Sequence, residues 1–361
     1  MFYHLFYPLS SDYSILNVFR YITFRSAYAG ITALVLCLIF GPMVIRALQK
    51  LEIGETIRTD GPQSHITKSG TPTMGGLLVI FTFLLATLLW ANLTNMYVWL
   101  LIFVAVGFGL IGFVDDFLKL RKGKGLTARS KLFWQILVAT MVGLFCTYFD
   151  PNRMGFATNL YVPFFKDFTP DLGGWYVVLI VIVIVGTSNA VNLTDGLDGL
   201  AIGPIIIATL TYTALVYITG HFKFAGYLNI QYVGGAGEIA VLTSAIVGAS
   251  LGFLWFNAYP AQMFMGDVGS LSLGAILGTV AVIAKQELLL ILVGGIFVIE
   301  ALSVIIQVAY FKYTGGKRFF KMAPLHHHFE HMGWEEPKVI VRFWIIAVVL
   351  AMLSLSTLKL R

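Results

Sequence analysis

The residues best suited to chemistry in this chain are five aspartates that adjoin long apolar runs. Asp115 and Asp116 close the apolar run 100–114, Asp195 and Asp198 lie in NLTDGLDG (192–199), and Asp267 lies in FMGDVGS (264–270). Carboxylates beside apolar membrane segments are energetically expensive, so they indicate a functional site. Mg²⁺ in proteins binds one or two carboxylates together with phosphate oxygens and water. The aspartates therefore point to metal-assisted chemistry on a phosphate group, where catalysis depends on positioning and charge neutralisation.

Helix capping is the alternative explanation for some of these acids. Asp198 and Asp267 precede apolar segments, and an acid at a helix N-terminus is favourable by about 0.3–1 kcal/mol. Capping does not explain Asp115 and Asp116, which we expect at the C-terminal end of their segment, where the helix dipole opposes negative charge. Consecutive helical residues diverge by about 100°, so these two carboxylates should have different partners.

The NLTDGLDG string offers Asn192, Asp195 and Asp198 around two glycines that permit close backbone approach to a ligand. Asp195 and Asp198 share one face if the turn is helical. A simple polar loop is the competing interpretation. Phe264, beside Asp267, could stack on a base or belong to the core.

Three consecutive histidines, His326 to His328, follow Pro324. Zinc is not favoured, because adjacent side chains diverge and the chain has no HExxH motif or thiolate partner. We expect one or two of these rings to donate hydrogen bonds to phosphate or sugar. Lys68, flanked by turn residues, is a candidate for phosphate binding, whereas Lys119, Lys122, Lys124 and Lys131 are interpreted by default as solvated topology markers. Glu300, inside IFVIEALSV, is either a buried carboxylate bonded across helices or part of a lipid head-group groove.

The elements that position these residues are membrane helices. The chain has 361 residues, of which 58% are hydrophobic and 12% charged, and its mean hydropathy is +0.84. These values exclude an ordinary soluble domain. Ten apolar stretches are long enough to cross the hydrocarbon layer as helices: 22–48, 74–91, 98–117, 132–149, 175–190, 200–219, 238–256, 268–284, 288–310 and 339–358. We predict an all-α, polytopic membrane protein that forms one domain over residues 1–361.

An even number of spans places both termini on one side of the membrane, and charge decides which side. Most of the 24 Lys and Arg residues fall in the loops that are inside if the termini are periplasmic. This orientation brings every motif above to the cytoplasmic face, so we predict the active site there. The net charge of +6 is explained by topology and gives no indication of nucleic acid. Cys37 and Cys146 lie in separate spans, which excludes a disulfide framework.

Five motifs, taken in order, carry a resemblance to a known family. TPTMGG, FVDD, NAVNLTDGLDGLA, FMGDVGS and MAPLHHHFE closely resemble the bacterial phospho-N-acetylmuramoyl-pentapeptide transferases, from about residue 19 to the C-terminus. The resemblance implies transfer of phospho-N-acetylmuramoyl-pentapeptide from its UDP carrier to undecaprenyl phosphate, with release of UMP. It also implies a requirement for Mg²⁺ and a location in the bacterial inner membrane.

The same resemblance implies roles for individual residues. Asp115, Asp116 and Asp267 would be the essential acids, with Asp267 as the Mg²⁺ ligand. The nucleotide-sugar site would be lined by Asn192, Asp195 and Asp198, and phosphates would be contacted by Lys68 and Lys131. Phe264 would stack on uracil. The diphosphate would lie near His326 and His327. Direct attack by the prenyl phosphate and a covalent aspartyl intermediate are both open, and direct attack is favoured because a phosphate monoester is already largely dianionic at pH 7.

Two other functions are considered. A sister transferase would use UDP-N-acetylglucosamine, although the histidine motif after MAP favours the muramoyl branch. An ion-coupled transporter would need acids near the middle of the bilayer, whereas only Glu300 is deep in a predicted span. A homodimer is compatible with the sequence but not required by it.

Overall fold

The computed structural model describes residues 1–50, 70–153, 155–165 and 168–359 of the chain. Its secondary structure is helical, with one isolated antiparallel bridge between Asn159 and Asp171 in the described part. Ten helices form the body of the molecule: α2 (Ile22–Lys50), α3 (Gly76–Trp90), α4 (Met96–Lys122), α5 (Ala128–Leu144), α6 (Trp175–Thr194), α7 (Ile202–Thr219), α9 (Ile239–Asn257), α10 (Gly266–Ile283), α12 (Gly295–Tyr313) and α14 (Glu336–Ser356).

Each of the ten predicted spans corresponds to one of these helices. Among the described residues, nine helices are long and apolar enough to cross a membrane, and α3 is a shorter apolar helix of 15 residues. The prediction of an all-α polytopic protein is therefore confirmed. The ninth predicted span is interrupted, since α11 (Leu290–Val293) ends at Gly294 before α12 begins. The orientation of the termini stays a prediction.

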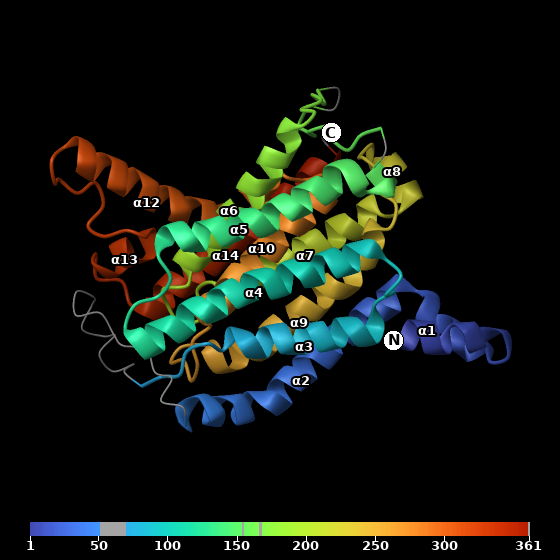
Figure 1. The fold of residues 1–361 in the computed structure, drawn as a ribbon, viewed down its shortest axis with the longest axis horizontal. Coiled ribbons are helices and arrows are strands. Elements are labelled where there is room, and N and C mark those ends of the chain that lie inside the picture. The colour runs from blue at the N-terminus through green and yellow to red at the C-terminus, as the bar shows by residue number, and fades with distance from the viewer. Residues whose placement is uncertain (51–69, 154, 166–167, 360–361) are drawn as a thin grey trace.

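Four short helices complete the described part of the chain: α1 (Phe2–Phe6), α8 (Phe222–Leu228), α11 and α13 (Leu325–Glu330). Five 3-10 helices are described: Pro8–Ser11, Ser14–Arg20, Pro151–Arg153, Ala236–Glu238 and Thr357–Lys359. A π-helical turn, Phe145–Phe149, extends α5. Figure 1 shows α4, α5 and α10 running side by side, while α12 extends outward from the bundle.

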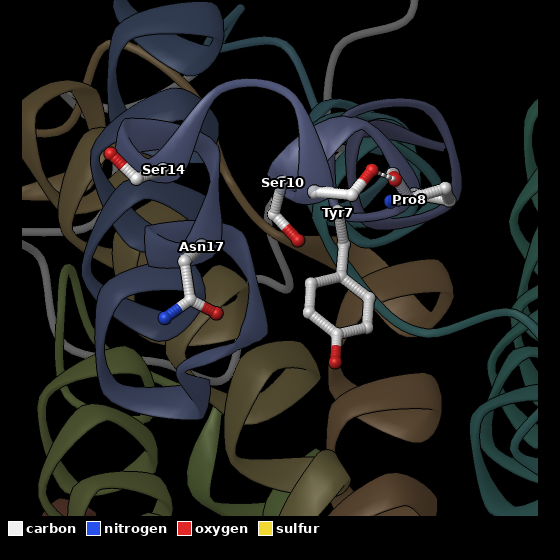
Figure 2. A pocket seen from close by; sticks show the side chains of 6 residues that line it. Tyr7, Pro8, Ser10, Ser14 and Asn17 are labelled. Atoms are coloured by element: carbon white, nitrogen blue, oxygen red, sulfur yellow. Dashed lines mark hydrogen bonds between the residues drawn. The ribbon is translucent and has the colours of Figure 1, made fainter.

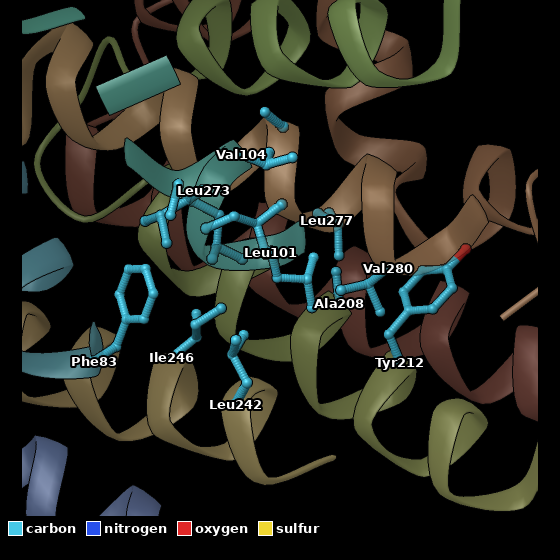
Figure 3. Packing of buried hydrophobic residues seen from close by; sticks show 14 of the residues in the cluster. Phe83, Leu101, Val104, Ala208, Tyr212, Leu242, Ile246, Leu273, Leu277 and Val280 are labelled. Atoms are coloured by element: carbon cyan, nitrogen blue, oxygen red, sulfur yellow. The ribbon is translucent and has the colours of Figure 1, made fainter. Parts of the chain in front are cut away.

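The most buried helices of the bundle are α10 and α9, although α9 still exposes Leu251 and Trp255. Every residue of α10 from Val268 to Ile283 is buried, and the helix packs against α4 and α6. Figure 3 shows Leu273, Leu277 and Val280 of this helix among apolar side chains of neighbouring helices. Glycine permits the close approach to α6, because a Cβ on Gly274 would lie 2.8 Å from the backbone of Ser188. The buried core thus fixes α10 against α4 and α6.

Helix α4 carries the adjacent aspartates further from its end than the sequence predicted. The helix starts at Asn95, whose side chain accepts a hydrogen bond from the Tyr97 N–H at 2.9 Å. It ends at Gly123, which adopts the left-handed conformation with φ 67° that glycine tolerates. The predicted span stopped at residue 117, whereas the helix continues to Lys122. Asp115 and Asp116 therefore lie within the last two turns.

The end of the bundle where α4 starts carries the N-terminal segment and a buried lysine. At the end formed by the start of α4, the amino group of Met1 donates to the Leu88 carbonyl. The N-terminal segment lines a pocket of about 450 Å³, and Figure 2 shows Tyr7, Ser10 and Asn17 around it. Lys285 is fully buried at this same end and donates to the carbonyls of Ala157 and Asn159 at 2.6 and 3.0 Å. Burial, reinforced by the Arg153 guanidinium, lowers the pKa of Lys285 to about 7. The predicted site residues that the structure describes lie at the opposite end of the bundle.

Candidate active site

Three carboxylates from two helices meet at the end of α4. Asp115 and Asp116 come from α4, and Asp267 comes from the first turn of α10. One oxygen of each lies within 4.8 Å of the others. Asp115 and Asp116 are buried, with 3% and 5% of their surface exposed, and Asp267 is partly exposed. The structure thus brings together the three acids that the sequence had placed in separate motifs.

The meeting of these helices depends on a glycine. A Cβ on Gly112, one turn before Asp115, would lie 2.3 Å from the carbonyl oxygen of Asp267. Only a residue without a side chain allows α10 to begin this close to α4. Gly266, directly before Asp267, has φ +72°, which turns the chain into the helix.

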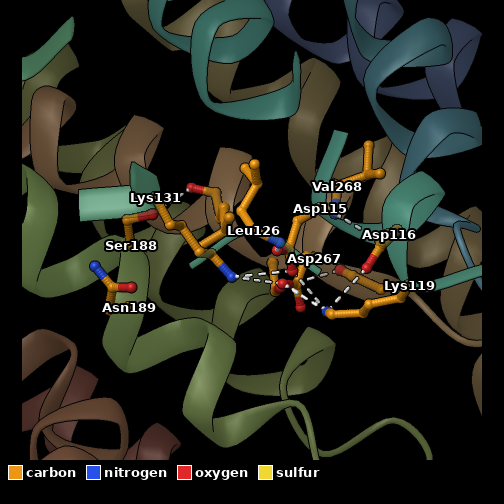
Figure 4. Close-up of polar contacts among 12 residues, drawn as sticks. Asp115, Asp116, Lys119, Leu126, Lys131, Ser188, Asn189, Asp267 and Val268 are labelled. Carbon is orange, nitrogen blue, oxygen red and sulfur yellow. Dashed lines mark hydrogen bonds and ion pairs between the residues drawn. The ribbon is translucent and has the colours of Figure 1, made fainter. Parts of the chain in front are cut away.

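Lys119 bonds to all three carboxylates. Its Nζ lies 2.7 Å from Asp115 Oδ2, 3.3 Å from Asp116 Oδ1 and 3.0 Å from Asp267 Oδ2. The residue is on α4, one turn after the aspartates, and Figure 4 shows it reaching back toward them. Lys131, from the first turn of α5, adds a second ammonium group at 2.5 Å from Asp267 Oδ2 and 3.5 Å from Asp115 Oδ2.

The two adjacent aspartates have different backbone partners. Asp115 Oδ1 accepts a hydrogen bond from the Leu126 N–H at 2.7 Å, which fixes the loop between α4 and α5. Asp116 Oδ2 accepts from the Val268 N–H at 3.3 Å and so contacts the first turn of α10. The neighbouring carboxylates thus have different backbone partners, although both also contact Lys119. Asp115 therefore stabilises the loop that leads to Lys131, whereas Asp116 stabilises the start of α10, the helix that carries Asp267.

The charges of this cluster suit a divalent cation and a phosphate. Three carboxylates oppose two ammonium groups, so the named side chains together keep one negative charge. Their clustered oxygens are hard ligands of the kind that Mg²⁺ prefers, and the two lysines can pair with phosphate oxygens as point charges. The donor set therefore fits Mg²⁺ with a phosphorylated substrate, with Asp267 the most exposed of the three acids.

The NLTDGLDG loop follows α6 and is fixed by neighbouring segments. Asp198 is buried, and its Oδ2 accepts a hydrogen bond from the Ala261 N–H at 2.9 Å. Its own N–H donates to Glu336 Oε1 at 3.1 Å. Asp198 thus connects this loop to the segment before α10 and to the start of α14, a role that helix capping alone does not describe. Asn192 and Asp195, at the end of α6, are half-buried.

The segment before α10 also pairs with the TPTMGG motif. The Phe264 N–H donates to the Pro72 carbonyl at 2.8 Å, and the Gly75 N–H donates to the Phe264 carbonyl at 2.8 Å. Phe264 is half-buried at this junction. Lys68, the phosphate-binding candidate, lies outside the described residues.

The histidine motif forms the start of α13. His326 is fully buried, and its Nδ1 lies 3.1 Å from Glu300 Oε2 of α12. His327 is half-buried, with Nδ1 2.7 Å from Glu330 Oε2. A Cβ on Gly196 would lie 2.3 Å from His326 Nε2, so the NLTDGLDG loop and α13 are in direct contact.

Lys119, expected by default to be a solvated topology marker, lies at the carboxylate cluster with 47% of its side chain exposed. The sequence signal for this position is spacing, because residues three and four apart share one helix face. Asp116 and Asp115 precede Lys119 by three and four positions, so the two carboxylates and the ammonium can meet on α4.

Two family descriptions match parts of the chain. A family model described as glycosyl transferase family 4 matches residues 98–285, a range that includes the three carboxylates, both lysines and the NLTDGLDG loop. Signature 1 of the phospho-N-acetylmuramoyl-pentapeptide-transferases matches residues 68–80.

Curated relatives align over the full length of the chain. The phospho-N-acetylmuramoyl-pentapeptide-transferase of Citrifermentans bemidjiense is 59% identical over 363 aligned residues, which cover 100% of both chains. The proteins of the same name from Pelobacter propionicus and Geobacter sp. strain M21 are each 58% identical, again over 100% of both chains.

Proposed function

Because the chain belongs to the phospho-N-acetylmuramoyl-pentapeptide transferase family, we propose that it transfers phospho-N-acetylmuramoyl-pentapeptide from UDP to undecaprenyl phosphate. The products are UMP and the first lipid-linked precursor of peptidoglycan. The observation that carries this proposal is the cluster of Asp115, Asp116 and Asp267 with two lysines, at one end of a bundle of apolar helices. A phosphorylated lipid in the bilayer and a water-soluble nucleotide can both reach such a position.

Divalent metal is part of the proposal. Asp267 would hold Mg²⁺, with Asp115 and Asp116 beside it, and the ion would supply charge neutralisation to the diphosphate. Lys119 and Lys131, already in contact with these acids, would pair with phosphate oxygens as the substrate enters. The lysines and aspartates thereby orient two phosphate groups that would otherwise repel each other.

The transfer itself requires little covalent participation by the protein. An oxygen of the prenyl phosphate attacks the phosphorus attached to the N-acetylmuramoyl sugar, and a new P–O bond forms there. The bond from this phosphorus to the bridging oxygen breaks, and its electron pair leaves with UMP. A phosphate monoester with a second pKa of about 6 is largely dianionic at pH 7, so the attacking oxygen needs orientation rather than deprotonation. We assign that orientation to Asp115, through the lysines that it contacts.

The remaining predicted residues fit the nucleotide-sugar side of the reaction. Asn192, Asp195 and Asp198 would contact the nucleotide sugar, and Phe264 would stack on uracil. His326 and His327 would lie near the diphosphate, and Lys68 would meet a phosphate. The contacts between the NLTDGLDG loop, the segment before α10 and α13 support this grouping, since they place three of these motifs in one region.

The membrane location follows from the same proposal. We propose that the protein resides in the bacterial inner membrane with both termini in the periplasm and the carboxylate cluster at the cytoplasmic face. The nucleotide sugar would enter from the cytoplasm, and the prenyl phosphate would enter laterally from the bilayer.

A substrate-choice assay tests the function. Purified protein in detergent is given Mg²⁺, undecaprenyl phosphate and either radiolabelled UDP-N-acetylmuramoyl-pentapeptide or radiolabelled UDP-N-acetylglucosamine. We expect label from the muramoyl substrate alone to appear in the lipid phase, with one UMP released per lipid product. Transfer from UDP-N-acetylglucosamine would identify the sister transferase, and no transfer from either substrate would reject the proposal.

The metal assignment has its own test in the same assay. Asp267→Asn removes one negative charge at nearly constant volume, and we expect turnover to fall by far more than tenfold, the equivalent of roughly 1.4 kcal/mol of barrier. Asp12→Asn, an exposed aspartate at the opposite end of the bundle, is the matched control and should retain the parent rate. Activity of Asp267→Asn within about tenfold of the parent at ordinary Mg²⁺ concentrations would show that Asp267 is not the metal ligand.

A further inference from the structure

Glu300 is a carboxylate buried inside an apolar helix, and the structure shows what it bonds. None of its surface is exposed. Its Oε2 accepts a hydrogen bond from the Leu325 N–H at 2.9 Å, and its Oε1 accepts one from the His326 N–H at 3.1 Å. These are the first two N–H groups of α13, which have no partner within that helix. Of the two interpretations left open by the sequence, Glu300 is the buried carboxylate bonded across helices.

The third contact of Glu300 determines the chemistry of a site histidine. His326 Nδ1 lies 3.1 Å from Glu300 Oε2. An ionised carboxylate only accepts hydrogen bonds, so Nδ1 must carry the proton in this pair. If the imidazole is neutral, the other nitrogen is then an acceptor. Beside an ionised Glu300, this geometry favours the neutral tautomer in which His326 Nε2 is unprotonated.

The other side of the His326 ring contacts the NLTDGLDG loop. Its Nε2 is buried and has no hydrogen-bond partner among the described residues. The nearest part of the loop is Gly196, where an added Cβ would lie 2.3 Å from Nε2 and 2.9 Å from Cε1. The ring thus occupies the space that any side chain at position 196 would need.

We propose that Glu300 is a positioning residue that acts through His326. It accepts hydrogen bonds from the start of α13 and also fixes the tautomer of His326. The His326 ring in turn fixes the NLTDGLDG loop at Gly196. For a neutral ring, the chemical consequence is that Nε2 accepts a hydrogen bond from a hydroxyl or amide donor of the sugar and peptide, so His326 would lie near the diphosphate without binding its oxygens. This inference rests on the proposed function, in which both segments bind the nucleotide sugar.

The tautomer can be measured without substrate. The protein is prepared with ring-¹⁵N-labelled histidine, and the His326 signals are identified by their loss in His326→Asn. We expect two-bond ¹H–¹⁵N correlations of the parent protein to show a protonated Nδ1 and an unprotonated Nε2. The opposite tautomer, or a ring protonated on both nitrogens, would overturn the proposal. This measurement stands even if the substrate-choice assay were to reject the transferase function.

A double-mutant cycle then separates positioning from capping. Glu300→Gln keeps the size of the side chain, but its amide group can no longer accept all three hydrogen bonds. We expect the KM for the nucleotide substrate to rise about tenfold while kcat changes less than about threefold and the KM for the lipid phosphate is unchanged. In a His326→Asn background the same substitution should add less than about twofold, because coupled residues are not additive. An equal KM increase in both backgrounds would show that Glu300 only caps α13, and the proposal would fall.

Two further variants keep the cycle interpretable. Ser303→Ala removes a hydroxyl one turn further along α12, where it donates to the Glu300 carbonyl, and should leave both KM values unchanged. Gly196→Ala disturbs the far end of the same chain of contacts and should reproduce the rise in nucleotide KM with Glu300 intact. If Glu300→Gln does not fold, Gly196→Ala and the tautomer measurement decide the question. A parent-like KM in Gly196→Ala would then count against the proposal.

Discussion

Lys119 determines the charge state of the candidate site at the scale of single residues. Its Nζ lies within 3.3 Å of an oxygen of each of the three carboxylates. An ammonium group at this position occupies oxygens that a divalent cation would also use, and its charge repels that cation. Lys119 is therefore expected to weaken metal binding while it stabilises the bound phosphates.

Lys119→Gln tests these two effects together. We expect the half-saturating Mg²⁺ concentration to fall, since one positive charge is removed, and kcat to fall about tenfold or more, or roughly 1.4 kcal/mol of barrier. Both values come from initial rates measured across a Mg²⁺ titration. Lys122→Gln, an exposed lysine one turn further along α4, is the control and should change neither. A rise in the Mg²⁺ requirement of Lys119→Gln would mean that the lysine assembles the metal site instead.

The adjacent aspartates should differ in kinetics because they differ in partners. Asp115→Asn should lower kcat with little change in the KM of the nucleotide substrate, as expected for a group that orients the attacking phosphate mainly in the transition state. Asp116→Asn leaves one acceptor oxygen where Asp116 uses two, for Lys119 and the Val268 N–H, and should also disturb Asp267. Steady-state kinetics with each substrate varied in turn measures both. If Asp115→Asn instead keeps kcat and raises the nucleotide KM, Asp115 is a binding residue.

Single residues were predictable from sequence where their chemistry is costly in context. The aspartates stood out because charge beside apolar segments needs a reason. Lys119 did not stand out, because lysines at a membrane boundary are explained equally well by topology. The Glu300–His326 pair joins positions 26 residues apart through a change of chain direction, and no local pattern specifies that contact.

At the scale of helices, the site depends on how closely α10 approaches α4. The bundle core buries α10 on all sides, and glycines at the contacts remove the side chains that would separate the backbones. Gly112 is the contact that lies nearest to the carboxylates. The geometry of the site is therefore a property of helix packing as much as of the acids themselves.

Gly112→Ala should damage both stability and activity. The added methyl group would lie 2.3 Å from the Asp267 carbonyl oxygen, and such overpacking typically costs about 1–3 kcal/mol. We expect a lower midpoint of thermal unfolding in detergent and a clear loss of turnover. Gly186→Ala on α6 is the matched control, because nothing lies within 4 Å of its Cβ position. There the midpoint should stay or rise, since alanine favours helix by up to about 1 kcal/mol over glycine. Equal effects in the two variants would argue against the importance of the α4–α10 contact.

The sequence predicted the existence of the long helices better than their ends. The length of an apolar stretch identifies a span but not where its helix ends. A basic segment continues α4 beyond the predicted limit of 117, and Gly123, six residues after that limit, ends the helix. Helix α13 could not be predicted, because its six residues have too little periodicity and its first N–H groups are satisfied by Glu300 from another helix.

At the scale of the whole molecule, both ends of the described chain lie away from the site. Met1 contacts Leu88 near the end of α3, and α14 begins at Glu336 beside Asp198 and runs from there away from the site. If the termini are periplasmic, the carboxylates must face the cytoplasm. Orientation relative to the membrane is thus a single binary question.

Thiol labelling answers that question. Cys37 and Cys146 are buried and should react little with a membrane-impermeant reagent. Lys124→Cys, in the exposed loop after α4, should be labelled in inverted membrane vesicles but not in intact cells, and Asp12→Cys should show the opposite pattern. Labelling of Lys124→Cys in cells with an intact inner membrane would reverse the orientation and, with it, the cytoplasmic position of the site.

Helix α3 has a further consequence for the surrounding lipid. Its 15 residues span about 22 Å at 1.5 Å per residue, whereas the hydrocarbon layer is about 30 Å thick. Leu77, Phe81 and Leu88 form an exposed stripe along it. A helix too short for its bilayer is accommodated by local thinning or by polar flanks that reach toward the surface. Since Gly75 and Gly76, at the start of α3, bond to the segment that leads to Asp267, thinning there would bring lipid phosphates down toward the carboxylates. The hydrophobic mismatch would then shorten the distance that the prenyl phosphate must travel to reach the nucleotide sugar.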